Sequence, residues 1–144
     1  MTEKDILTTK EDVNEKEVSE ESEELTRCER MVIKVIWESE KLLSIKEVTA
    51  KVNERFERGW KVQTVSSLLG HLVRKGYLSM ERSGRTFFYS PLVTEEENLT
   101  RQIKRMLDFW CEGHADEFLK NFLKDRALTE EEKVNMRKII NDLN

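Results

Sequence analysis

The stretch GWKVQTVSSLLGHLVRKGYL, residues 59–78 of this 144-residue chain, decides the fold. Its apolar residues recur at spacings of three and four, which predicts a helix with one narrow buried stripe made of Val65, Leu68, Leu69, Leu72 and Val73. Lys75 and Gly76 are typical of a helix C-terminus, where a cation and a glycine are both favoured. The opposite face carries polar and basic side chains, so this helix offers one side to a core and the other to a polar partner.

Two further helices are predicted before this stretch, each beginning at a Ser or Thr that is followed three residues later by Glu. Thr26 and Glu29 form such a capping box for the first helix, and Ser44 and Glu47 form one for the second. The apolar spacing predicts inner faces made of Cys28, Met31, Val32, Val35 and Ile36 in the first helix and of Val48, Val52 and Phe56 in the second. We expect the first helix to end between residues 38 and 41 and the second at Gly59, acting as a C-cap.

After Gly76 the apolar period falls from about 3.6 residues to 2, which is typical of strands. Residues 77–82 and 86–90 form two strand-like runs, with Pro91 ending the second. Between them Ser83, Gly84 and Arg85 form a hairpin turn in which glycine supplies the unusual backbone angle. Three helices followed by a basic-tipped hairpin predict a mainly α fold with a small β-hairpin, the winged helix-turn-helix.

The C-terminal residues 93–144 are predicted to form three amphipathic helices. Capping boxes at Thr94 with Glu97 and at Thr129 with Glu132 mark two helix starts, and Gly113 marks a break. These short helices have too little chain to cover their own apolar faces, so a partner surface is implied, and self-association is the simplest partner. The expected dimerisation residues are Leu99, Ile103, Met106, Leu107, Trp110, Phe118, Phe122, Ile139 and Ile140.

Charge is distributed unevenly along the chain, whose formal net charge is -4. Residues 1–25 carry three Lys and Arg against ten Asp and Glu, residues 26–92 carry thirteen against seven, and residues 93–144 carry nine against twelve. A basic central segment with acidic flanks is typical of a nucleic-acid-binding module. We therefore predict an acidic flexible tail (1–25), a DNA-binding winged helix-turn-helix domain (26–92) and a helical dimerisation region (93–144), and we hypothesise that the tail competes with DNA for the basic surface.

The polar face of the quoted helix supplies the candidate DNA contacts, because the second helix of a helix-turn-helix lies in the major groove. Gln can pair with adenine, and Ser and Thr can donate, accept or approach a thymine methyl. Lys61, Arg74 and Lys75 are interpreted as phosphate anchors, and Arg82 and Arg85 as wing cations that contact phosphates or the minor groove. Gly70, costly in mid-helix, suggests close approach of another backbone, from protein or DNA. The remaining candidates on this face are Gln63, Thr64, Ser66, Ser67 and His71.

Other functions find less support in the sequence. It contains no nucleophile elbow and no glycine-rich phosphate loop, so an enzyme is not expected, and neither is a cofactor. Cys28 and Cys111 are too few for a disulfide framework or a metal knuckle and are interpreted as reduced, packed thiols, with a thiol or metal sensor as a weaker alternative. The chain has neither a signal peptide nor a membrane-spanning run, so we expect a cytoplasmic protein. The main rival function is a winged-helix module that binds protein instead of DNA.

Several motifs together resemble the family of penicillinase repressors and copper-transport repressors, from about residue 25 to the C-terminus. They are E..V...W from Glu29 to Trp37, W....V..LL..L..KG.L from Trp60 to Leu78, GR...Y.PLV..EE from Gly84 to Glu96, and NF at Asn121. The resemblance implies a bacterial homodimer that holds two winged helices on a dyad operator with TACA and TGTA half-sites and represses a resistance or stress-response gene. On matching positions it implies DNA contacts by Lys61, Gln63, Thr64, Ser66, Ser67 and His71, with Arg82 and Arg85 in the wing.

The resemblance also bears on induction. In the β-lactam branch of the family a sensor protease system cuts the repressor between Asn and Phe, and the gapless match places Arg105 and Met106 there. The copper branch ends in a paired CxC motif, whereas this chain ends in MRKIINDLN. The sequence therefore leaves the inducing signal and the regulated gene undefined.

Overall fold

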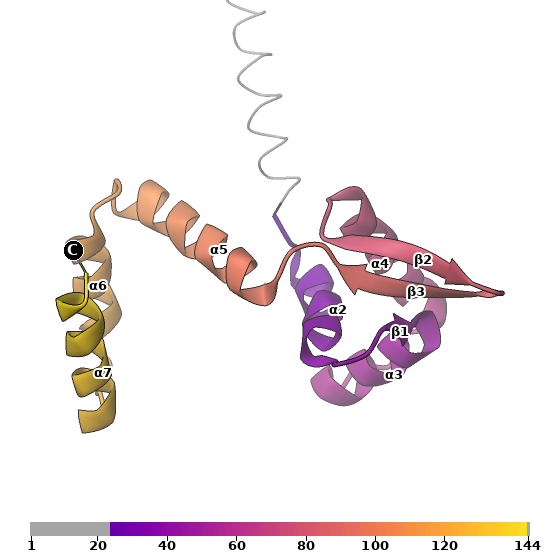
Figure 1. The fold of residues 1–144 in the computed structure, drawn as a ribbon, viewed down its shortest axis with the longest axis horizontal. Coiled ribbons are helices and arrows are strands. Elements are labelled where there is room, and N and C mark those ends of the chain that lie inside the picture. The colour runs from indigo at the N-terminus through magenta and orange to yellow at the C-terminus, as the bar shows by residue number, and fades with distance from the viewer. Residues whose placement is uncertain (1–23, 144) are drawn as a thin grey trace, which may run out of the picture. The chain divides into compact units, whose positions relative to one another are not determined.

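The computed structural model describes residues 24–143 and has the predicted mainly α architecture with a small β-sheet (Figure 1). The chain divides into two compact units, residues 24–97 and 98–143. The predicted acidic tail lies outside the described residues, apart from Glu24 and Leu25. Leu25 is buried with the core of the first unit, so the core includes the residue just before the first helix cap, Thr26.

The first unit opens with the two predicted helices, α2 (Arg27–Glu38) and α3 (Ile45–Phe56). The side chain of Thr26 accepts from the backbone N–H of Glu29, and Ser44 and Glu47 form a complete reciprocal capping box. Each cap satisfies backbone donors that have no partner within a helix. Both helix starts predicted from the sequence are therefore confirmed.

Two details of these helices differ from the prediction. Cys28 is exposed, and the inner face of α2 is instead completed by Glu29 and by Ile33, which is fully buried. Helix α3 ends before Gly59, because Glu57 takes the left-handed conformation at its C-cap with φ 52°. The left-handed conformation is unusual for a residue other than Gly, Asn or Asp, so the sequence carried no sign of it.

The quoted stretch forms α4 (Val62–Arg74), and a three-stranded antiparallel sheet completes the unit. Strands β2 (Leu78–Ser83) and β3 (Thr86–Pro91) make the predicted hairpin, with Ser83 paired to Thr86 across the two-residue turn. Gly84 in that turn has φ 64°, as the turn requires. The sequence did not reveal β1 (Leu43–Ser44), a strand of two residues that pairs with the outer side of β3.

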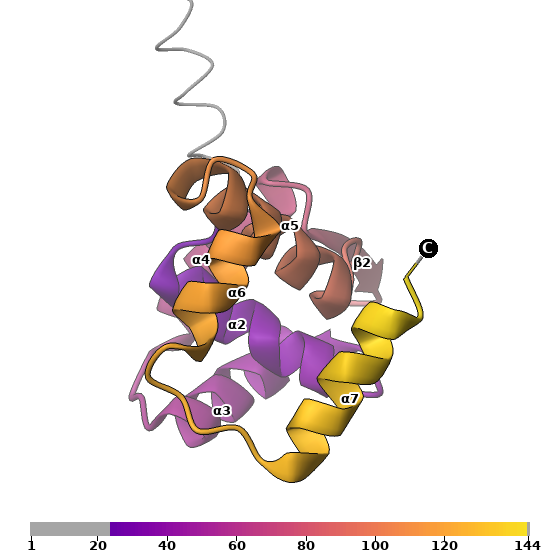
Figure 2. The same ribbon diagram turned by 90° about the vertical axis from the view of Figure 1, so that its left-hand side faces the viewer.

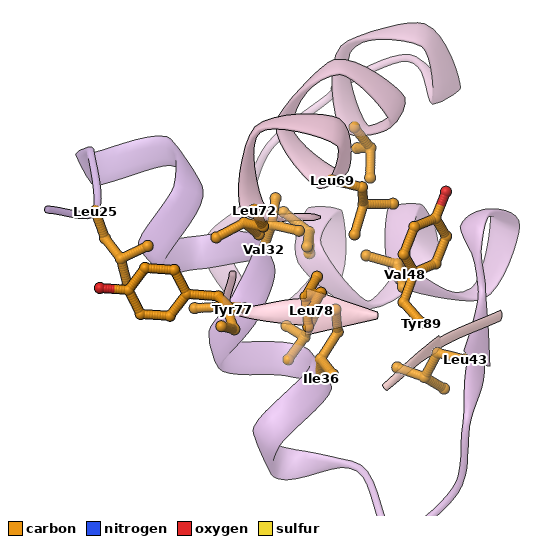
Figure 3. Close-up of a cluster of buried hydrophobic side chains, with 14 of the residues drawn as sticks. Leu25, Val32, Ile36, Leu43, Val48, Leu69, Leu72, Tyr77, Leu78 and Tyr89 are labelled. Carbon is orange, nitrogen blue, oxygen red and sulfur yellow. The ribbon is translucent and has the colours of Figure 1, made fainter. Parts of the chain in front are cut away.

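Apolar side chains from α2, α3, α4 and all three strands meet in one core (Figure 3). Val65, Leu69 and Leu72 of α4 are fully buried there, which confirms the predicted stripe, while Leu68 and Val73 pack at its edge. Burying a side chain of this size contributes about 1.5–3 kcal/mol to folding. The core therefore fixes which face of α4 points outward.

The second unit contains most of α5 (Glu95–Trp110) together with α6 (Ala115–Leu123) and α7 (Glu130–Asn141), which Figure 2 shows as separate helices joined by loops. The predicted break lies at Glu112 and Gly113, both with positive φ, and Thr129 with Glu132 caps α7 as predicted. Neither α6 nor α7 contains a buried residue within the described part of the chain. The first turn of α5 belongs to the first unit, where Glu95 forms an ion pair with Lys34.

Candidate nucleic-acid interface

The outer face of α4 presents the side chains that the sequence indicated. Lys61, Gln63, Thr64, Ser66, Ser67 and Arg74 are exposed, and His71 is half-buried. Opposite them lie the three fully buried residues of the stripe. A helix of this length is about 20 Å long and can cross a major groove about 12 Å wide. The geometry thus brings a row of short hydrogen-bonding side chains and two cations onto one accessible surface.

The turn between α3 and α4 is held by one side chain of α3. Asn53 Nδ2 donates to the carbonyl oxygen of Trp60 at 2.9 Å, and the Trp60 N–H donates back to Asn53 Oδ1, also at 2.9 Å. The main-chain carbonyl oxygen of Asn53 accepts from the backbone N–H groups of Glu57 and Arg58. The indole of Trp60 is partly buried against the core. These contacts fix the chain immediately before Lys61, and sequence patterns had not assigned Asn53 any role.

The start of α4 differs from the starts of α2, α3 and α7. Those helices carry a Ser or Thr cap and a glutamate at the third position, whereas α4 begins at Lys61 with no side-chain cap and no acidic residue in its first turn. The free N–H groups at a helix start bear partial positive charge and frequently contact DNA phosphates. The first turn of α4 is therefore compatible with a neighbouring anion.

The hairpin of β2 and β3 projects from the unit as the wing, with Gly84 and Arg85 at its tip (Figure 1). Arg82 and Arg85 are both exposed. Arg82 Nε donates to the carbonyl oxygen of Gly84 at 2.8 Å, and its guanidinium lies over the ring of Phe87, 5.8 Å from the centroid. Arg82 thus stands in one defined orientation on the wing, as a preorganised cation.

The prediction that Lys75 anchors a DNA phosphate is wrong. Lys75 Nζ bonds to both carboxylate oxygens of Glu29, at 2.9 and 2.8 Å, and to the carbonyl oxygen of Glu24 at 2.8 Å. The side chain of Glu29 is 2% exposed and that of Lys75 19%. Because the ammonium neutralises a buried carboxylate, Lys75 is a structural cation at the C-terminal end of α4.

The structure also shows surface residues that the sequence had not singled out. Arg58 is exposed in the turn that leads into α4. Its position two residues before Trp60, where the sequence predicts the entry to this helix, could have indicated it as a further surface cation. Met80 and Phe87, 49% and 40% exposed, lie on the wing in register with Tyr89 and Arg82 respectively. Around Gly70, no described atom other than those of its chain neighbours and of the adjacent α4 backbone lies within 4 Å of where a Cβ would stand. No other backbone of this unit therefore approaches Gly70, and close approach of DNA or of another protein chain stays a prediction.

Among residues 24–143, no group of three or more His, Cys, Asp and Glu side chains could hold a metal ion. Cys28 lies exposed on α2 and Cys111 is half-buried after α5. None of the helices in this part of the chain has the length and apolar character needed to cross a membrane.

The sequence profile of the penicillinase repressor family matches residues 25–142, which is most of the chain. The penicillinase repressor of Bacillus licheniformis is 27% identical over 109 residues, covering 76% of this chain and 83% of that protein. The methicillin resistance regulatory protein MecI of Mammaliicoccus sciuri is 24% identical over 118 residues, covering 82% and 94%.

Among solved structures, the DNA-binding domain of the repressor BlaI is similar with a TM-score of 0.45 and 28% identity, covering 51% of this chain and 87% of that domain. BlaI from Bacillus licheniformis in complex with the blaP half-operator gives a TM-score of 0.43 at the same identity. The family resemblance noted in the sequence and the expectation of a protein without enzymatic activity are both confirmed by the family profile. The chain belongs to the penicillinase repressor family and is a transcriptional repressor.

Proposed function

We propose that this repressor binds duplex DNA sequence-specifically, as a homodimer on a dyad operator, and so controls a resistance or stress-response gene. The observation that carries the proposal is the division of α4 into two faces. Three residues of its apolar stripe are fully buried, while the opposite face is polar, exposed and part of a basic segment. A buried stripe makes the helix rigid, and a rigid helix can present its outer side chains to base edges in a fixed register.

Each element of this surface has a distinct role in the proposal. Gln63, Thr64 and Ser67, with Ser66 and His71 beside them, face the bases, because their side chains can pair with base edges in the major groove. Lys61 and Arg74 contact phosphates at the two ends of α4, and Arg82 and Arg85 do so from the wing. Phosphate contacts supply affinity and salt dependence, whereas base contacts supply preference.

The dimer is supported by the apolar side chains that the second unit leaves exposed. Phe109 and Trp110 are 75% and 76% exposed, and eight further large apolar residues of this unit are exposed, namely Leu99, Ile103, Met106, Phe122, Val134, Ile139, Ile140 and Leu143. Leu107 and Phe118, also predicted to lie at the interface, are half-buried within the single chain. Apolar surface of this extent is typical of a protein interaction site. A second copy of the chain would cover it and place two winged helices on the two halves of a dyad site.

The test is selection of bound sequences from a random duplex pool by the full chain, followed by titration of the enriched duplex at several salt concentrations. We expect a two-fold symmetric site with half-sites similar to TACA and TGTA. Four phosphate-binding cations per protomer give a slope of log affinity against log salt of about -7 for a dimer. Replacing Arg85 with Ala would reduce the slope by about 2, and Thr64→Ala would relax preference at one position of each half-site.

Failure to enrich any sequence would contradict the proposal. Weak binding that disappears at moderate salt, combined with salt-tolerant capture of a protein by the winged helix, would instead support the alternative of a protein-interaction module.

A further inference from the structure

The segment that joins α3 to α4 has few anchors of its own. Of its residues 57–61, Glu57, Arg58, Gly59 and Lys61 are exposed and only Trp60 is partly buried. A segment of this kind moves unless hydrogen bonds restrain it, because each freed residue gains backbone entropy. Its conformation matters because Lys61 and Gln63, both proposed to touch DNA, follow it directly.

Asn53 restrains this segment through the backbone of Trp60. The side-chain amide of Asn53 bonds to both the N–H and the carbonyl oxygen of Trp60, each at 2.9 Å. The main-chain carbonyl oxygen of Asn53 accepts from the backbone N–H groups of Glu57 and Arg58. An amide side chain can do this because it carries a donor and an acceptor on one planar group. Asn53 is itself fixed, since it lies in the last turn of α3, whose Val48 and Val52 are fully buried. Through Asn53, the core thus fixes the position of the turn.

The same arrangement explains how α4 can begin without a cap. A Ser or Thr cap places an oxygen acceptor against the first N–H groups of a helix, as Thr26, Ser44 and Thr129 do here. At α4 the restraint comes from Asn53 of α3, which holds the backbone of Trp60, the residue just before the N-cap Lys61. The first turn of α4 keeps its outward donors beside Lys61. Asn53 therefore orders the helix start without introducing a side-chain acceptor that would compete with a phosphate.

We propose that Asn53 is the positioning residue that holds the first turn of α4 in the orientation needed for base discrimination. This inference rests on the proposed function, because Asn53 acts through Lys61, Gln63 and Thr64 and does not itself touch DNA. Loss of its two side-chain hydrogen bonds frees the turn, so that the side chains of the first turn sample several positions over the base edges. Specific binding then weakens more than binding to unrelated duplexes, which depends mainly on charge.

The experiment compares Asn53→Ala with a matched variant of the same helix. Thr49→Val removes the hydrogen bond from Thr49 Oγ1 to the carbonyl oxygen of Ile45, 2.7 Å long, at a buried position one turn earlier. Each full-length protein is titrated with the duplex enriched from the random pool and with the same duplex carrying scrambled half-sites. The measured quantity is the ratio of the two dissociation constants, in which effects on folded fraction and on general charge cancel.

We expect Asn53→Ala to lower this specificity ratio about tenfold, since freeing two or three turn residues offsets roughly one good base contact. Thr49→Val should stay within about twofold of wild type. If the Ala variant does not fold, Asn53→Asp replaces it, because Asp keeps the acceptor for the Trp60 N–H and loses the donor. Hydrogen exchange at the Trp60 amide, followed in the same proteins, should accelerate in the Asn53 variants only.

The outcomes separate this inference from the function on which it rests. If the wild-type chain shows no preference between the two duplexes, the proposed function fails and the role of Asn53 fails with it. If the wild type discriminates and Asn53→Ala keeps the same ratio, or loses affinity equally for both duplexes, Asn53 is only a structural residue and the inference is overturned.

Discussion

At the scale of single residues, one buried ion pair changes the interpretation of two positions. The capping box suggested that Glu29 caps the start of α2. The position of Lys75 at the end of α4 suggested that Lys75 contacts a phosphate. Both suggestions depended on local sequence. The two residues are 46 positions apart, and only the fold places the carboxylate and the ammonium 2.8 Å from each other.

This pair leads to an asymmetric prediction. Lys75→Met should lower the free energy of unfolding by about 3–5 kcal/mol, because it leaves a carboxylate that is 2% exposed without its cation. Glu29→Gln should cost less, since the partly exposed ammonium of Lys75 can turn toward water. Denaturant unfolding of both variants measures the difference. A larger loss for the glutamine variant would contradict this account.

Gly70 gives a prediction in which stability and binding change in opposite directions. Gly70→Ala should raise the free energy of unfolding by about 1 kcal/mol, because alanine favours the helix and no described atom blocks its Cβ. If DNA approaches the bare backbone at this position, the same variant should bind the enriched duplex more weakly. Gly59→Ala, also open around its Cβ but outside the helix, is the control. An alanine variant that is more stable and binds normally would show that Gly70 has no role in DNA contact.

At the scale of elements, the start of α3 depends on ionised Glu47. The side chain of Lys41 and the backbone and hydroxyl of Ser44 bind this carboxylate, and they lower the pKa of Glu47 below the ordinary value of a glutamate. A group whose pKa is lower in the folded state stabilises the fold above its unfolded pKa. That contribution disappears as the pH falls through the folded pKa.

Glu47→Gln should therefore lower the stability at neutral pH, and the gap between variant and wild type should close as the pH falls below the ordinary glutamate pKa. Thermal unfolding between pH 7 and pH 3 measures this gap. Glu54→Gln, on the same helix but outside the capping box, is the control for loss of one charge. A gap that stays constant over this range would mean that the carboxylate charge contributes nothing to the cap.

At the scale of the whole molecule, the exposed apolar side chains of α5 should decide the oligomeric state. Leu99→Glu should convert the proposed dimer to a monomer, because Leu99 is 53% exposed in the single chain and would face apolar surface in the pair. Thr100→Glu adds the same charge on a neighbouring face of α5 as a control. Sedimentation equilibrium gives the mass of the particle. Because bivalent binding raises affinity about a hundredfold, the monomeric variant should bind the whole operator about a hundredfold more weakly than the wild type does, and no more tightly than a half operator. A monomeric wild-type chain, or a Leu99→Glu chain of unchanged mass, would contradict the dimer.

The acidic N-terminal residues give a second prediction at this scale. Residues 1–23 carry nine Asp and Glu against three Lys and Arg, and the described chain begins where Lys75 holds the carbonyl oxygen of Glu24, at the C-terminal end of α4. Twenty-three residues can span up to about 75 Å, more than three times the length of α4. Deletion of residues 1–23 should therefore raise DNA affinity several-fold, most strongly at low salt. A chain of full length with these acids changed to amides should behave in the same way, whereas unchanged affinity and salt slope would remove the hypothesis.

The sequence by itself determined the helices, the hairpin and the outward face of α4. These features follow from capping boxes, from the spacing of apolar residues and from turn glycines, all of which act within a few residues along the chain. The sequence did not indicate the left-handed Glu57 or strand β1, because neither depends on interactions within a few residues along the chain. A left-handed glutamate and a strand of two residues exist because neighbouring elements hold them, and local propensity does not indicate either one.

The tertiary structure alone decided which polar residues serve the fold and which remain exposed on the surface. It paired Lys75 with Glu29, turned Cys28 outward and assigned Asn53 to the backbone of Trp60, over separations of 7 to 46 residues. Hydrogen bonds and ion pairs depend on the three-dimensional distance between two groups, which the order of residues does not give. The repressor's polar surface was therefore visible in the sequence, whereas the contacts that hold that surface in place required the fold.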